Sequence, residues 1–252
     1  MPEFHLDHII VGVRDLEAAA ADWRALGLVA TDGGTHPQGG TRNAIVRFPD
    51  RSFLELMTVV DPEAVARRSP SFLALLEQHP DGPISWAVRT DDIAAAHASI
   101  AARGFRVGPI RDGVGERDSG RVARWRTFHV DEAGFPFVLA YDGPPTSEPS
   151  ADGLPVRGIA AAIVQAISAP AFAERFARAF DATLDDGRVV FDGGEAIVAE
   201  EPRGHPGVVG AELLLDNERR AATYLRERDV PASDGWLRDR RLHGLRVRLV
   251  VQ

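Results

Sequence analysis

The chain contains no cysteine and no lysine among its 252 residues. Without cysteine there is no disulfide, no thiolate nucleophile and no thiolate metal site, so any metal ion must be held by His, Asp or Glu. Without lysine the chain cannot form a Schiff base with a substrate carbonyl. Carboxylates and imidazoles remain as the groups best able to carry chemistry.

Long apolar runs and basic clusters are missing as well. No stretch approaches the roughly 18 uninterrupted apolar residues of a membrane span. All 29 basic residues are arginine, 37 residues are acidic, and the net charge is −8. Such a charge argues against a nucleic-acid partner. Because no basic and apolar leader precedes the first strand pattern, we expect a soluble cytoplasmic protein with neither a membrane nor a nucleic acid as partner.

Four predicted helices share one length and a similar pattern of start and stop residues. Each begins at a capping residue and ends twelve residues later: Asp15 to Gly27, Asp92 to Gly104, Ser168 to Phe180 and Asn217 to Asp229. Along each helix apolar residues recur at helical spacing on one face. A helix repeated in this way predicts four copies of one structural unit.

Each helix follows an apolar strand pattern, and short strand-like runs split by Gly, Asp and Pro come after it. The first helix, for example, follows "LDHIIVGV" and precedes "TRNAIVRF" and "SFLELMTVV". The unit is therefore a strand, a helix and three strands, and the predicted fold class is α+β with tandem βαβββ units. Residues 143–155 are rich in Pro, Ser and Asp, so we expect them to link a domain of residues 1–142 to a second pair of units in residues 156–252.

Two ionisable side chains interrupt the apolar strand patterns of the first unit. By strand alternation His8 is expected to share a face with Leu6 and Ile10, and Glu55 lies in the apolar run "SFLELM". An ionised carboxylate on an apolar face needs a partner or a cation. We therefore expect Glu55 to lie against His8 or a metal ion. The alternative for His8 is a neutral histidine buried in the wall of a cleft.

Candidate substrate-binding residues lie in both of the first two units. The loop "GGTHPQGGTRNAI" offers His36, Arg42 and Asn43 as donors to a carboxylate or carbonyl, although ordinary turn chemistry with a surface arginine would give the same pattern. In the second unit Trp86 would form an apolar wall and Arg126 of "RVARWRTF" would face the substrate. The alternative for Arg126 is a solvated strand face.

Three stretches, "LDHIIVGVRDLEAAAADWRALGL", "GGTHPQGGTRNAI" and "SFLELM", together resemble the glyoxalase-like branch of the vicinal oxygen chelate superfamily. The resemblance implies that paired units curve around a shared cleft, with the active one in residues 1–142. Metal-dependent members use a His on the first strand of a unit and a Glu on its last. Carried over, this makes His8 and Glu55 ligands of a divalent ion such as Zn, Ni, Mn, Fe or Mg.

The paired unit departs from this family pattern. Ser85 and Leu139 occupy the positions that match His8 and Glu55. Two protein ligands make a weak site, so His36 or His129 would have to complete the set. A site without any metal agrees with the sequence equally well. The second pair of units has no histidine at the matching positions, so we expect it to be structural.

The resemblance implies an enzyme that acts on a small oxygenated organic substrate by isomerase, lyase or ring-opening chemistry. His8 and Glu55 would then be catalytic, holding an ion or moving a proton. The alternative is a metal-free protein of the same fold that binds or sequesters a small molecule, which the missing ligands favour. A third hypothesis is a scaffold for dimerisation, and a homodimer is the assembly we expect.

Overall fold

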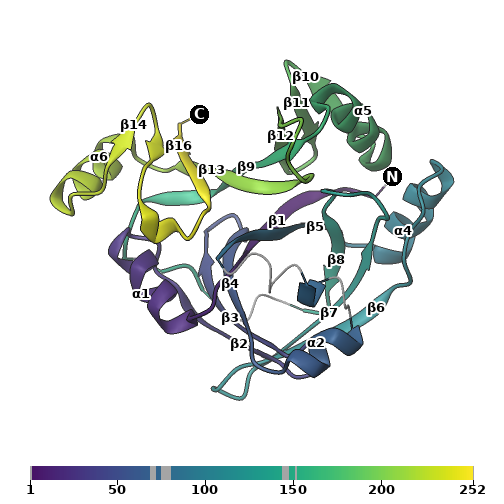
Figure 1. The fold of residues 1–252 in the computed structure, drawn as a ribbon, viewed down its shortest axis with the longest axis horizontal. Helices are drawn as coiled ribbons and strands as arrows, with labels where there is room; N and C mark the ends of the chain where they lie inside the picture. Colours follow the sequence, from purple (N-terminus) through teal and green to yellow (C-terminus); the bar gives the residue numbers. More distant parts are fainter. Residues whose placement is uncertain (1, 69–71, 75–80, 144–147, 151, 252) are drawn as a thin grey trace.

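The computed structural model describes residues 2–68, 72–74, 81–143, 148–150 and 152–251. The predicted unit recurs four times along the chain (Figure 1). The first unit contains β1 (His5–Gly12), α1 (Leu16–Ala25), β2 (Thr31–His36), β3 (Thr41–Arg47) and β4 (Phe53–Val59), and α2 (Pro62–Arg68) follows it. The second contains β5 (Gly82–Arg89), α4 (Ile93–Ala102), β6 (Arg111–Glu116), β7 (Val122–His129) and β8 (Phe137–Tyr141).

The second half of the chain repeats this order. The third unit contains β9 (Val156–Ala166), α5 (Ala169–Phe180), β10 (Thr183–Asp185), β11 (Arg188–Phe191) and β12 (Gly194–Glu200). The fourth contains β13 (Gly207–Leu215), α6 (Glu218–Glu227), β14 (Ala232–Ser233), β15 (Trp236–Leu237), the 3₁₀ turn η1 (Arg240–Leu242) and β16 (Arg246–Val250). The α+β class and the repeated βαβββ unit are therefore confirmed.

The four unit helices begin where the sequence predicts. The side chains of Asp15, Asp92 and Asn217 accept hydrogen bonds from backbone N–H groups in the first turns of α1, α4 and α6. Ser168 precedes α5 without a side-chain cap bond, and a proline lies in that first turn instead. None of the helices in the described ranges has the length and apolar content needed to span a membrane.

The first two units close into an eight-stranded barrel with the order β1-β4-β3-β2-β6-β7-β8-β5. The last two units form an open sheet with the order β10-β11-β12-β9-β13-β16-β15-β14. The first strands of paired units lie side by side and antiparallel, β1 with β5 and β9 with β13. Figure 1 shows the open sheet lying across β1 and β5 on the outside of the barrel.

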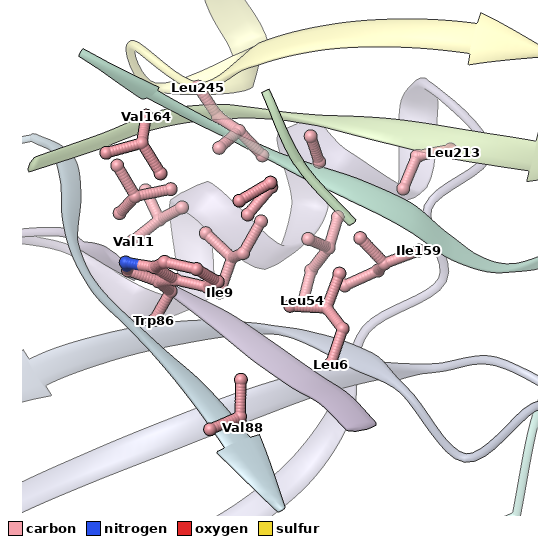
Figure 2. Packing of buried hydrophobic residues seen from close by; sticks show 14 of the residues in the cluster. Leu6, Ile9, Val11, Leu54, Trp86, Val88, Ile159, Val164, Leu213 and Leu245 are labelled. Carbon is pink, nitrogen blue, oxygen red and sulfur yellow. The ribbon is translucent and has the colours of Figure 1, made fainter. Parts of the chain in front are cut away.

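One apolar layer joins the barrel to the open sheet (Figure 2). Its side chains are almost inaccessible to solvent, and they belong to a single core that runs through both halves. Because β1 and β5 turn one face toward this layer, their other face lines the barrel interior. The labelled residues of the layer are Leu6, Ile9, Val11, Leu54, Trp86 and Val88 from the barrel, and Ile159, Val164, Leu213 and Leu245 from the second half.

Candidate functional site

A bulge near the start of β1 determines which side chains enter the barrel. The pairing of β1 with β5 shifts between Leu6 and His8, which leaves Asp7 as an extra residue in the strand. Leu6 therefore packs in the apolar layer with Ile9, while Asp7 and His8 both line the barrel cavity. The expectation that His8 and Leu6 share a face was wrong, because simple alternation does not hold across a bulge.

Glu55 and His8 meet inside the barrel, as the sequence predicts. Glu55 lies on β4, which runs parallel to β1, and its Oε2 atom is 3.5 Å from His8 Nε2. Its other oxygen, Oε1, accepts a hydrogen bond of 2.6 Å from Asn43 Nδ2 on β3. Glu55, His8 and Asn43 are each at most 5% exposed. One carboxylate oxygen is thus fixed and the other faces the imidazole.

Asp7 holds the opposite side of the imidazole. Its Oδ1 atom lies 2.6 Å from His8 Nδ1 and accepts a hydrogen bond of 2.8 Å from the Tyr141 hydroxyl. Arg89 lies 3.7 Å from the other Asp7 oxygen. Desolvation of its hydroxyl, followed by the charge of Asp7, raises the pKa of Tyr141 well above its ordinary value, so the hydroxyl stays a donor although 39% of the whole residue is exposed.

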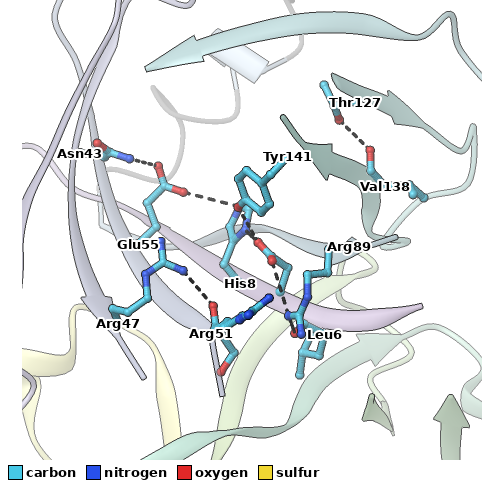
Figure 3. A network of polar contacts seen from close by, with 12 residues as sticks. Leu6, His8, Asn43, Arg47, Arg51, Glu55, Arg89, Thr127, Val138 and Tyr141 are labelled. Atoms are coloured by element: carbon cyan, nitrogen blue, oxygen red, sulfur yellow. Dashed lines mark hydrogen bonds and ion pairs between the residues drawn. The ribbon is translucent and has the colours of Figure 1, made fainter. Parts of the chain in front are cut away.

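These side chains form one continuous polar line from Asn43 through Glu55, His8 and Asp7 to Tyr141 (Figure 3). Aromatic rings hold its centre: Phe53 stacks on the His8 ring with centroids 4.4 Å apart, and Phe137 meets it edge-on at 5.4 Å. A rigid, desolvated carboxylate beside an oriented imidazole is an arrangement suited to moving a proton.

The cavity around this line has a volume of about 1660 Å³. Arginines line both of its ends. Arg68 at the end of α2 and Arg111 at the start of β6 lie at one end, together with His36 and His129. The turns that join β3 to β4 and β6 to β7 form the other end, with Arg47, Arg51, Arg117 and Arg121. The carboxylates thus lie between two cationic rims.

The two cavity histidines outside the polar line have lowered pKa values. Burial is the main cause for His36, whose Nδ1 lies 2.8 Å from the Thr41 hydroxyl oxygen. For His129 the causes are desolvation in the cavity wall and then the positive charges of Arg68 and Arg111. Both rings therefore bind a proton less readily than a solvent-exposed histidine does.

Two of the predicted substrate-binding residues lie elsewhere than expected. Arg42 points to the outside of β3, where its guanidinium is 3.1 Å from Glu17 of α1. Arg126 lies on the outer face of β7, 3.8 Å from Asp142. Strand alternation, whose phase the sequence alone does not determine, assigns both side chains to the other face. Trp86 borders the cavity, but its ring packs in the apolar layer against Phe176 and its indole N–H donates to a backbone carbonyl.

The remaining predicted residues, His36 and Asn43, do line the cavity with His8 and Glu55. Asp7 and Tyr141 were missed. The sequence carried a signal for Tyr141, because it lies two residues after Leu139, the residue that matches Glu55, and therefore on the same face of its strand. No sequence pattern distinguished the cavity arginines Arg68 and Arg111 from the other arginines, of which the chain has 29 in all.

A divalent metal, which the family resemblance implies, finds only part of a ligand set here. His8 Nε2 and Glu55 Oε2 are the right donor atoms at a suitable spacing, and Asp7 orients the imidazole as an outer-shell carboxylate would. Within the described ranges, however, no three His, Asp or Glu side chains gather to hold an ion. His36 is engaged with Thr41. The donors therefore fall short of the three protein ligands typical of a catalytic ion.

Comparisons with known proteins agree with the fold. A family model described as "Glyoxalase-like domain" matches residues 6–180. No curated protein sequence matches the chain. A hypothetical protein from Staphylococcus aureus has a similar structure, with a TM-score of 0.74 and 13% identity over 99% of this chain and 100% of that one.

Two solved enzymes share the fold at lower similarity. The Mn(II)-bound glyoxalase from Novosphingobium aromaticivorans aligns with a TM-score of 0.64 and 11% identity, over 100% of this chain and 83% of its own. A mutant 4-hydroxymandelate synthase from Streptomyces coelicolor aligns with a TM-score of 0.59 and 16% identity, over 95% of this chain and 78% of its own. At such identities the likeness concerns the fold alone.

Proposed function

The chain belongs to the glyoxalase-like domain family, and from that premise we propose that it is an enzyme that moves a proton on a small oxygenated organic substrate in the barrel cavity. The observation that carries the proposal is the buried Glu55 carboxylate, fixed at one oxygen by Asn43 and facing His8 Nε2 with the other. A glyoxalase and a synthase are among the solved structures that share the fold, so the proposal assigns to this chain a class of function that the fold can carry.

Glu55 is the base in this proposal. Its Oε2 atom takes a proton from a carbon beside the substrate carbonyl, and the electrons of the broken C–H bond move to the carbonyl oxygen. The cationic lining of the cavity stabilises the resulting oxyanion. Low exposure of Glu55, at 4%, leaves its carboxylate little hydration to lose when a substrate binds. Protonation of the enolate at a neighbouring carbon completes an isomerisation, and delivery of a deuteron that Glu55 has acquired from D₂O to the original carbon completes an exchange.

His8 supports this transfer from the other side. With Nδ1 hydrogen-bonded to Asp7, its Nε2 atom lies beside Glu55 Oε2 and can exchange the proton with it. Asp7 fixes the ring orientation and Tyr141 fixes Asp7. Because the donors among the described residues stop at two ligands, no step of this mechanism is assigned to a metal ion.

Proton exchange into deuterated water tests the proposal. Purified protein is incubated in D₂O with a panel of 2-oxo acids and α-hydroxy ketones, and loss of the C–H signal beside each carbonyl is followed by NMR. We expect exchange above the buffer rate for at least one compound, and a loss of about 100-fold or more in Glu55→Gln.

The matched control is Glu212→Gln, which removes a carboxylate that is 2% exposed but lies in the open sheet, paired with Arg188 and Arg248. Exchange by the folded control should equal that of the wild type. Equal rates in wild type and Glu55→Gln would overturn the assignment of the base. A rate that depends on micromolar Mn²⁺ and disappears with a chelator would overturn the metal-free mechanism.

Binding without turnover is the second candidate function, and the incomplete ligand set favours it. In that case panel compounds would perturb the NMR spectrum of the protein at saturable concentrations, yet none would exchange its proton. Such a result would replace the enzymatic proposal with sequestration of a small molecule.

A further inference from the structure

Arg68 and Arg111 differ from the barrel arginines that are paired with a carboxylate. Arg42, Arg89 and Arg126 each have a carboxylate within 4.0 Å, at 3.1, 3.7 and 3.8 Å. Among the residues that the structure describes, neither Arg68 nor Arg111 has such a partner, although both line the cavity. Two cations therefore face the same cavity without a carboxylate of the described residues at ion-pair distance to balance them.

The folding of the chain brings these two arginines to one end of the barrel. Arg68 is the last residue of α2, which follows the strand that carries Glu55. Arg111 begins β6, where it pairs with Thr127, and β7 then runs on to His129 at the same end. His36, the last residue of β2, lines the cavity at the same end.

The mutual repulsion of Arg68 and Arg111 favours the binding of an anion between them. Burial and then the charge of Arg111 lower the pKa of Arg68. The charges of both arginines also lower the pKa of His129. Arg68 is half-buried and Arg111 is exposed, and like charges that line one cavity repel one another, so an oxyanion between them removes that repulsion. A guanidinium presents a planar fork of N–H donors that matches a carboxylate or a phosphate.

We propose that Arg68 and Arg111 bind an oxyanionic group of the substrate, a carboxylate or a phosphate, at the α2 end of the cavity. This rests on the proposed function and narrows it to anionic oxygenated compounds, such as oxo acids or phosphorylated ketones. With its anion held at this end, the substrate extends along the cavity toward Glu55. Holding one end of the substrate reduces its freedom to adopt unproductive orientations.

The test measures anion binding rather than turnover. Glu55→Gln is titrated with sodium malonate and, separately, with inorganic phosphate at constant ionic strength, by isothermal calorimetry. We expect saturable binding with a Kd of roughly 1 mM or tighter for one of the two. Preference for malonate would identify the carboxylate form, and preference for phosphate the phosphate form. Absence of saturable binding by both anions would overturn the subsite and leave the assignment of Glu55 intact.

Substitutions in the same Glu55→Gln background locate the site. Arg68→Gln and Arg111→Gln should each weaken binding about tenfold or more, because each removes charge-assisted hydrogen bonds. The matched controls are Arg67→Gln, whose side chain is paired with Glu63 on the exposed side of α2, and Arg126→Gln on the outer face of β7. Both controls should bind as tightly as their parent. Equal losses in controls and site variants would show a general charge effect and overturn the proposal.

Discussion

His8 has a carboxylate beside each of its ring nitrogens. Asp7 lies 2.6 Å from Nδ1 and Glu55 lies 3.5 Å from Nε2. The shorter contact is to Asp7, so this residue sets the orientation of the ring in the described network. Because Tyr141 also donates to Asp7, the position of the imidazole depends on a residue from the far unit of the barrel. The site therefore requires both units, even though its two central groups belong to one.

The lowered pKa of His36 predicts that the protein loses stability as the pH falls. Its pKa is lowered in the folded protein from the ordinary value of 6.5, chiefly by burial. As the pH falls, His36 of the unfolded chain binds its proton at a higher pH than His36 of the folded protein does. The stability that the neutral ring contributes is therefore fully present above pH 6.5 and is lost as the pH falls through the folded pKa. In His36→Gln the free energy of unfolding, measured by urea titration from pH 7.5 to about 5, should fall less steeply than in the wild type.

A Thr41→Val variant separates burial of the imidazole from its hydrogen bond. It removes the partner of His36 Nδ1 but keeps the ring, so stability should drop at every pH by about 1 kcal/mol while the slope persists. His129, whose pKa is lowered as well, should retain part of the slope in His36→Gln. An unchanged slope in His36→Gln would contradict the role given to its burial.

At the scale of elements, β2 and β3 show how a glycine positions the base. A Cβ atom added at Gly33 would lie 2.3 Å from Asn43 Oδ1, which is closer than any unstrained contact. Asn43 therefore fits beside β2, with its Nδ2 on Glu55, only because residue 33 has no side chain. The carboxylate depends on the neighbouring strand for its orientation.

Gly33→Ala should push Asn43 away from Glu55 and lower the proton-exchange rate about tenfold, because the carboxylate loses its fixed orientation. The control is Gly82→Ala, where an added Cβ meets nothing within 4 Å. Deuterium exchange by NMR and the urea midpoint are measured for both variants. If Gly33→Ala exchanges as fast as Gly82→Ala, then the Asn43 contact does not position the base.

The repeated elements could be predicted from sequence because their signals are local. Helix caps and stops are read within a dozen residues, and the caps Asp15 and Asp92 recur at the predicted places. The meeting of His8 with Glu55 was predicted from the family resemblance and from the need of a buried carboxylate for a partner. The bulge that brings in Asp7 arises from the pairing of β1 with β5, 70 residues or more apart along the chain, and no local pattern encodes it.

At the scale of the whole molecule, the two halves stabilise one another. The open sheet covers the outer faces of β1 and β5, and Trp86 of the barrel packs against Phe176 of α5. A second contact lies at the edge of the layer, where His243 of the fourth unit is 2.8 Å from Asp81 and 3.2 Å from Asp22 of α1. The linker is therefore only one of several connections between them.

This shared layer predicts that the chain unfolds as one unit. Each large apolar side chain buried in the layer contributes about 1.5–3 kcal/mol. The five from β1 and β5, Leu6, Ile9, Val11, Trp86 and Val88, together contribute on the order of 10 kcal/mol, which is comparable with the net stability of a whole domain. Neither half should stay folded when the other unfolds, so urea unfolding followed by far-UV circular dichroism and by tryptophan fluorescence should give coincident single transitions.

Leu213→Ala, in the open sheet, should lower the free energy of unfolding by about 2–5 kcal/mol and shift both curves equally, because it leaves a void in the common layer. Two separate transitions, with the variant moving only one of them, would mean that the barrel folds independently of the sheet that covers it.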